Sequence, residues 1–186
     1  MAFVLKNRTQ VTASLQLAND KARAMLRSAG HTLQPGEAAI GVLQTDNGAE
    51  LIGGKFARLC NELQICQQQS TAYVHEQMTR IDRIHGIMFN MVRPMLMKAG
   101  MPKCGWSLAY MHATWIRNRL PSETLQGHSP YYHIYGKEDD NLAKARVMFC
   151  DAYAFLNPEE RKDKLSPRAE KLSYVGHDAT SGSYLS

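Results

Sequence analysis

A chain of 186 residues is long enough for one domain, or for one domain and part of a second. Its content of 44% hydrophobic and 21% charged residues is typical of a soluble globular protein, and its apolar runs are too short to span a bilayer. A net charge of +5 and a pI of about 9.1 favour a polyanionic partner such as DNA, although many basic proteins bind no nucleic acid.

The cysteines and the first residues bear on the compartment. Cys60, Cys66, Cys104 and Cys150 form no C-x-x-C pair, and no histidines stand near them at zinc-ligand spacing. The apolar start of the chain ends at Lys6, too early for a signal peptide. We therefore expect reduced thiols, no structural zinc and an intracellular protein, in the nucleus or the cytoplasm, without a membrane partner.

Apolar periodicity predicts a strand-helix alternation in the first half of the chain. The predicted elements are a strand at 2–5, a helix at 12–28, a strand at 40–44, a helix at 54–63 and a short strand at 65–70. A polar loop over 71–79 follows, and then come two helices at 80–98 and 106–120. Pro94 lies inside the first of these, where a proline costs about 3 kcal/mol, so we expect a bend or break there.

The apolar faces of these helices predict the core. Met88, Met91 and Met95 of the helix at 80–98 recur at helical spacing and are expected to be buried. The same holds for the stripe Leu108, Met111, Trp115 and Ile116. Beyond a charged, linker-like segment the tail carries strand candidates at 147–156, 172–175 and 182–185. The order of elements favours an α/β core followed by a small β appendage.

Two carboxylates stand where strand and helix are predicted to meet. Asp46 follows the strand at 40–44 and precedes an Asn-Gly turn, and Asp82 opens the long helix, with 35 residues between the two aspartates. Carboxylates placed in this way can converge on a pair of divalent metal ions, as phosphoryl transfer requires. Two other interpretations stay open: Asp46 as a turn cap, and Asp82 as a helix-start carboxylate favoured by the macrodipole.

Five segments in the same order carry a family resemblance over nearly the whole chain. They begin with D-N-G-A-E at Asp46 and W-S-L-A…N-R-L-P at Trp106, and continue with S-P-Y…G-K at Ser129, R-V…C-D-A-Y at Arg146 and K-L-S-P-R-A…Y-V-G at Lys164. Together they resemble the integrase of copia-type retrotransposons. The resemblance implies an incomplete RNase H-like core at 1–126, a linker at 127–145 and a partial SH3-like β module at 146–186.

The departures from the family pattern concern the chemistry. Asp82 stands where the family carries its third carboxylate, a glutamate, and Phe149 replaces a glycine. The family's first aspartate lies on a strand with no counterpart here, since the only earlier aspartate, Asp20, falls inside a predicted helix. The family's N-terminal zinc-binding module has no counterpart either.

The resemblance also implies ligands and partners. Mg²⁺ or Mn²⁺ would be held by Asp46 and Asp82, and nucleic acid would be contacted by Lys55, Arg58, Arg80 and Arg83, although scattered solvated charges explain these cations equally well. The DNA would be the retroelement ends and the target duplex. A homo-oligomer or a parent polyprotein is a further expected partner.

The side chain of Asp82 is one methylene shorter than glutamate, and a misplacement of about 1 Å can cost on the order of 10²-fold in rate. We therefore expect a degenerate polynucleotidyl transferase that is inactive alone. The alternative is a non-catalytic remnant that binds nucleic acid or protein. Whether the chain is a complete gene product stays open.

Overall fold

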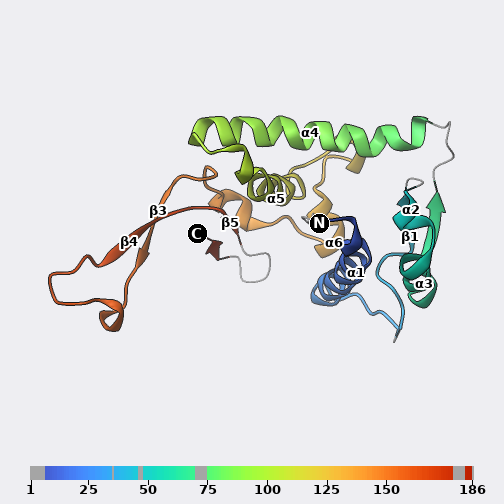
Figure 1. Ribbon diagram of the computed structural model, residues 1–186, viewed down its shortest axis with the longest axis horizontal. Coiled ribbons are helices and arrows are strands. Elements are labelled where there is room, and N and C mark those ends of the chain that lie inside the picture. Colours follow the sequence, from blue (N-terminus) through green and yellow to red (C-terminus); the bar gives the residue numbers. More distant parts are fainter. Residues whose placement is uncertain (1–6, 35, 46–47, 70–74, 178–182, 186) are drawn as a thin grey trace. The chain divides into compact units, whose positions relative to one another are not determined.

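The computed structural model describes residues 7–34, 36–45, 48–69, 75–177 and 183–185. The chain divides into two compact units (Figure 1). The first holds Met1–Ile87 and Asn118–Glu138, and the second holds Met88–Arg117 and Asp139–Ser186. Helices and strands both occur in each unit, which confirms the predicted α/β class.

The first unit is built on a parallel pair of short strands. Its main elements are α1 (Val11–Ser28), β1 (Val42–Thr45), α2 (Ala49–Ile52), α3 (Gly54–Glu62), β2 (Cys66–Gln69), the start of α4 (His75–Ala99) and α6 (Pro130–Tyr135). Strands β1 and β2 pair in register, from Val42 opposite Cys66 to Thr45 opposite Gln69. Parallel strands need a crossover, and α2 and α3 supply it.

Helix α3 closes the core of this unit as its sequence predicts. Phe56 and Cys60 are buried on one face of α3, and they pack with Leu15 of α1 and with Ile65. One polar side chain shares the buried face of α1. Asn19 is fully buried there, and its Oδ1 accepts a hydrogen bond of 2.9 Å from the amide of Ala39, which ties the loop before β1 to α1.

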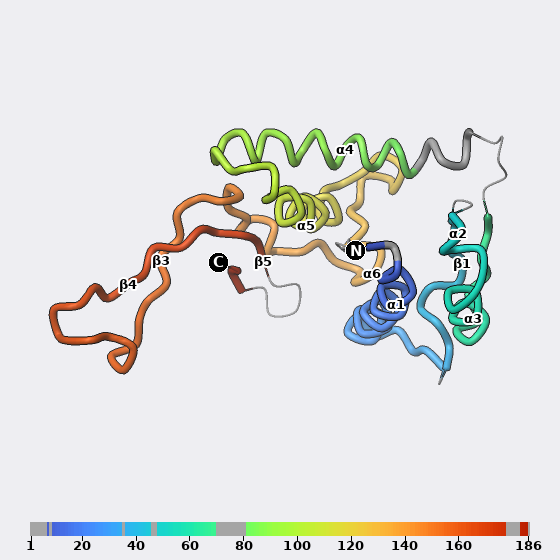
Figure 2. The backbone as a smooth tube through the Cα atoms, viewed as in Figure 1, coloured from blue at the N-terminus to red at the C-terminus, as the bar shows by residue number. Residues whose placement is uncertain are grey.

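The second unit joins helices to two β hairpins (Figure 2). It contains α4 from Met88 onward, α5 (Trp106–Arg117), β3 (Asp151–Phe155), β4 (Ala169–Ser173), β5 (Gly176–His177) and β6 (Tyr184–Leu185). Strands β3 and β4 are antiparallel, as are β5 and β6. The described strands after residue 146 thus form two separate pairs, and the SH3-like module stays a prediction.

Methionines and alanines make the core of the second unit. Met88 and Val92 of α4 are buried against Ala109 and Ala113 of α5, and the other predicted methionines, Met91 and Met95, pack partly buried against this cluster. The predicted apolar stripe of α5 is wrong at Leu108 and Met111, which are 41% and 50% exposed, whereas Trp115 and Ile116 are half-buried. The alanine face of α5 is buried against α4 instead.

Several predicted bounds are also wrong. Helix α4 begins at His75, within the predicted loop, and it continues through Pro94 to Ala99 without a break. Strand β3 begins at Asp151 rather than at 147, because Phe149 has a left-handed backbone with φ of +64°, which ends any extended run before it. The strand predicted at 2–5 lies outside the described residues.

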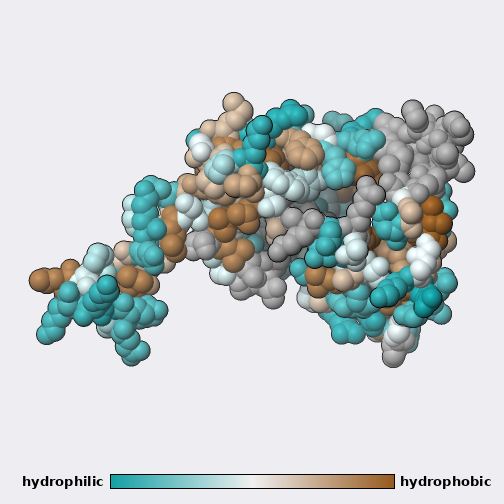
Figure 3. Space-filling view, viewed as in Figure 1, coloured by the Kyte–Doolittle hydropathy of each residue, from teal (hydrophilic) through white to brown (hydrophobic). Residues whose placement is uncertain are grey.

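The β3–β4 hairpin carries exposed rings beside charges. Tyr153 and Phe155 are both 68% exposed, and the Arg161 guanidinium lies 5.0 Å from the centre of the Phe155 ring. Across the strands, Lys171 pairs with Asp151 at 2.9 Å. Apolar and charged side chains therefore alternate on the surface of this hairpin (Figure 3).

Candidate functional site

The backbone that leads into Asp46 is anchored by one glutamine. Thr45, the last residue of β1, is buried, and its Oγ1 accepts a 3.1 Å hydrogen bond from Nε2 of Gln67 in β2. The same Nε2 donates to the carbonyl of Leu51 in α2 at 2.7 Å. Gln67 thereby fixes the end of β1 to β2 and α2. Asp46 itself lies outside the described residues, so its role as a ligand stays a prediction.

Asp82 lies on α4 with its side chain exposed to solvent. Because α4 begins at His75, Asp82 stands about two turns inside the helix. The macrodipole acts on charges within the first turn, so the interpretation of Asp82 as a helix-start carboxylate is wrong. His85, one turn later, is exposed as expected of a surface residue.

A two-metal centre needs more donors than the described side chains bring together. Over the described ranges, no three side chains of His, Cys, Asp or Glu gather closely enough to hold a metal ion. Asp46 and Asp82 remain the residues that the family resemblance assigns to the metal.

The predicted phosphate-binding cations divide between two helices. Lys55 and Arg58 are exposed and three residues apart on α3, so they share a face opposite the buried Phe56. Arg83 is exposed on α4. Arg80 lies in α4, but its side chain is outside the described part of the chain.

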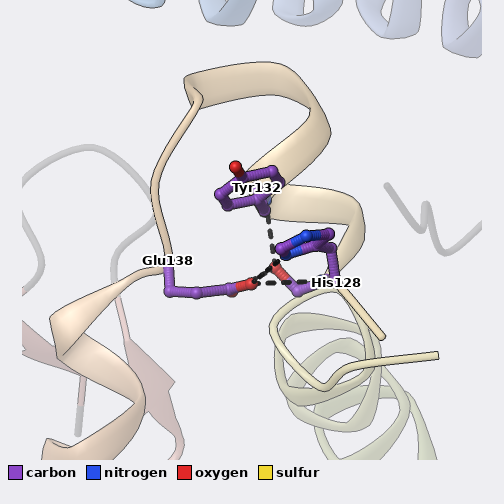
Figure 4. A network of polar contacts seen from close by, with 4 residues as sticks. His128, Tyr132 and Glu138 are labelled. Carbon is purple, nitrogen blue, oxygen red and sulfur yellow. Dashed lines mark hydrogen bonds and ion pairs between the residues drawn. The ribbon is translucent and has the colours of Figure 1, made fainter. Parts of the chain in front are cut away.

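A polar network at α6 is a feature that the sequence motifs did not identify (Figure 4). Ser129 is fully buried and caps α6: its Oγ accepts from the amide of Tyr132 at 3.0 Å and donates to Oε2 of Glu138 at 2.5 Å. The hydrogen bond from Ser129 is the main cause of a lowered pKa of Glu138, to which His128 adds at 3.8 Å. Both uses of the hydroxyl are structural, so Ser129 is a helix cap rather than a nucleophile.

Two histidines come together in the second unit, and their spacing in the sequence gave no indication of this. His112 of α5 and His177 of β5 are buried against the same ring, that of Trp115. Their separation along the chain gives no motif, and only the packing of β5 against α5 brings them together.

Comparison with known proteins gives sequence relatives of one kind. No family model matches the chain. It is 30% identical over 146 residues to the retrovirus-related Pol polyprotein from transposon RE2 of Arabidopsis thaliana, covering 78% of this chain and 10% of that protein. The Pol polyprotein from transposon TNT 1-94 of Nicotiana tabacum is 25% identical over 176 residues, which cover 94% of this chain and 12% of that protein. The chain thus spans about a tenth of the length of these relatives.

Two solved structures give a partial likeness to this chain. The HTLV-2 integrase catalytic core domain in complex with magnesium has a TM-score of 0.46 and 17% identity, over 70% of this chain and 71% of that chain. An intasome of simian T-cell lymphotropic virus in complex with the PP2A regulatory subunit B56 gamma has a TM-score of 0.49 and 16% identity, over 91% of this chain and 54% of that chain. On its sequence matches and its ordered motifs, the chain is similar to a segment of the Pol polyproteins of copia-type retrotransposons.

Proposed function

We propose that this integrase-derived chain has lost DNA strand transfer and retains DNA binding. The observation that carries the first part is the state of position 82. An exposed aspartate stands there in place of the family's glutamate, and the described residues gather no three metal-binding side chains. Two-metal phosphoryl transfer needs about three carboxylates around ions roughly 3.5–4 Å apart.

A nicking and strand-transfer assay with Mn²⁺ tests the loss of catalysis. The 186-residue chain is expected to give no product above a no-protein control. The matched control is Asp46→Asn: if the unmodified chain does turn over and this substitution abolishes turnover, the proposal is wrong. Titration with Mg²⁺ or Mn²⁺ gives a second readout, because a metal that binds the folded state raises Tm. If the metal raises Tm and Asp46→Asn removes this rise, a metal site survives. That result would contradict the proposal that the remaining carboxylates no longer serve as a metal site.

DNA binding is supported by the cationic face of α3. Lys55 and Arg58 project from one side of a helix whose other side is buried through Phe56 and Cys60, so the two charges are held on a supported surface. Neutralising a phosphate with a cation releases a counterion, and affinity then falls with salt. We propose that this face contacts the DNA backbone, together with Arg83 and Arg80 of α4.

The salt dependence of duplex binding tests this contact. Replacing Lys55 or Arg58 with alanine is expected to weaken binding on all sequences alike and to reduce the slope of log K against log salt by about 1 each. Lys162, an exposed cation of the β3–β4 hairpin loop, provides the matched control, since its loss should leave the slope unchanged. Equal effects of all three substitutions, or binding without salt dependence, would remove the α3 face as the DNA contact.

The remaining elements of the proposal rest on the family relationship. We propose that residues 1–126 form part of an RNase H-like core and that residues 146–186 form part of an SH3-like module. Retroelement ends and target DNA are the proposed ligands, and a homo-oligomer or the parent polyprotein is the proposed assembly. The proposed location is the nucleus or the cytoplasm. Among the described residues, no helix has the length and apolarity to cross a membrane.

A further inference from the structure

Aromatic side chains of the second unit gather where α5 meets β5 and β6. The His177 ring stacks on Trp115, with centroids 4.6 Å apart and planes 19° apart. The His112 ring lies parallel to the Trp115 ring, at 6.0 Å and 5°. Tyr174 meets both histidine rings edge-on, at 5.5 Å from His112 and 5.7 Å from His177. Tyr184 of β6 completes the group, with its ring centroid 4.8 Å from that of His177. We call this group the nest; its five rings are those of His112, Trp115, Tyr174, His177 and Tyr184.

Three of the four ring nitrogens of the two imidazoles are buried without a hydrogen-bond partner among the described residues. His112 is 3% exposed and His177 is 8% exposed. The unpartnered atoms are Nδ1 of His112 and both ring nitrogens of His177, whereas the His112 ring also bonds with the Arg146 backbone. Such unsatisfied buried groups are rare in proteins. An imidazolium at these positions would need solvent or a counter-charge that the nest does not provide.

The groups around the imidazoles do not supply that counter-charge. Burial is the main cause that lowers the pKa of His112, and the nearby His177 lowers it further, against the opposing Arg146 backbone bond. Burial likewise raises the pKa of Tyr174, whose other neighbours include Tyr184 and the Cys150 thiol.

None of the groups named around the nest in the described part of the chain is a carboxylate. Asp178 follows His177 in sequence but lies outside the described residues.

The hairpin formed by β5 and β6 contacts α5 through this group of rings, where His177 stacks on Trp115. Strands β5 and β6 pair through Gly176 with Leu185 and His177 with Tyr184. The amide of Val175 adds one bond of 2.9 Å to Leu185. The Gly176 backbone borders the His112 ring, because a Cβ on Gly176 would lie 3.9 Å from Nδ1 of His112, at ordinary van der Waals distance.

We propose that His112, Trp115 and His177 form a pH-sensitive latch that holds the β5–β6 hairpin on α5 while the His112 imidazole is neutral. Protonation of His112 releases the hairpin, because the released form takes up the proton in water and the latched form does not. The latch is complete above the ordinary histidine pKa of 6.5 and weakens as pH falls below it. Because one histidine is involved, the released fraction rises by at most about tenfold per pH unit. This device depends on neither DNA nor metal, so it goes beyond the proposed function.

The test uses the full chain with Trp106→Phe, which leaves Trp115 as the single tryptophan reporter. Imidazole resonances, Trp115 fluorescence and hydrogen exchange of the Val175 amide, corrected for the intrinsic rate, are followed from pH 8 to pH 4.5. The expected result is a His112 midpoint below 6.5, with loss of Val175 protection and a change in Trp115 emission at the same midpoint. His112 protonating at 6.5 or above, or Val175 protection equal at pH 7.5 and pH 5, overturns the latch.

Variants assign the response to the nest. His112→Phe and His177→Phe keep a ring against Trp115 and are expected to reduce the pH response, with the hairpin staying protected at pH 5. The matched control is His133→Gln, at an exposed position of α6, which should leave the response unchanged. If the control alters the response as much as the nest variants do, the latch is wrong. Should a nest variant not fold, the titration of the unmodified histidines decides.

Discussion

Phe149 combines a strained backbone with a buried ring, and replacing it separates the two effects. Its φ of +64° is left-handed, which costs a non-glycine residue about 1–2 kcal/mol. Its ring is 9% exposed in the core of the second unit, with Cζ 3.6 Å from where a Cβ on Gly105 would lie. Truncating a buried phenylalanine costs about 3–5 kcal/mol, so burial outweighs strain and any truncation should destabilise the unit.

The order of the two truncations is the informative result. At position 149 glycine escapes the left-handed penalty, and after its greater unfolded-state entropy is subtracted it should be about 0.5–1 kcal/mol more stable than alanine. At Phe56, buried at 3% exposure within α3, alanine should instead be more stable than glycine by about 1 kcal/mol. Urea unfolding of the four variants measures both differences. If Phe149→Ala is as stable as Phe149→Gly, the left-handed backbone does not carry the cost assigned to it.

Three further outcomes follow from the same geometry. Ser129→Ala should lower stability by about 1–2 kcal/mol in urea unfolding, whereas Ser129→Thr should keep the cap of α6. The lowered pKa of Glu138 contributes stability that is present above its usual value of 4.5 and is lost as pH falls through the folded pKa, so the cost of Ser129→Ala should shrink in acid; a pH-independent cost would contradict this. Met88→Ala should cost about 2–5 kcal/mol and Met97→Ala, at an 81% exposed position, less than about 0.5 kcal/mol, and equal midpoints would contradict the core assignment. Burial raises the pKa of the Cys60 thiol, so Cys60 should react with a disulfide reagent more slowly than the exposed thiols at pH 8, which mass spectrometry of the labelled chain checks.

Local sequence patterns predicted where the helices lie better than they predicted which face of each helix is buried. The face of α3 was predicted because Phe56 and Cys60 repeat at helical spacing, and that pattern coincides with the buried side. On α5 the large apolar residues mark the exposed side, because α4 packs on the small side chains of Ala109 and Ala113. Hydrophobicity alone gives the larger residues more weight, whereas close helix contact favours the smaller ones.

Tertiary context also accounts for the missed site features. Pro94 does not end α4, although a proline removes one hydrogen bond of the helix. The residues of α4 before and after it belong to packed segments, and packing outweighs local propensity. The His112–His177 nest and the Gln67 anchor join residues far apart in sequence, so no motif spacing predicts them.

The contacts that hold the end of β1, which leads into Asp46, do not involve position 82. The two can therefore be tested separately. Gln67 holds the end of β1 through Thr45 and Leu51, and these contacts stabilise the parallel pair whether or not a metal binds. Asp82→Glu would extend the carboxylate by one methylene and so restore its reach. It would not restore the number of ligands, because two ions need about three carboxylates. Metal binding gained by Asp82→Glu without turnover would therefore assign the proposed loss of catalysis to the number of ligands rather than to the reach of one.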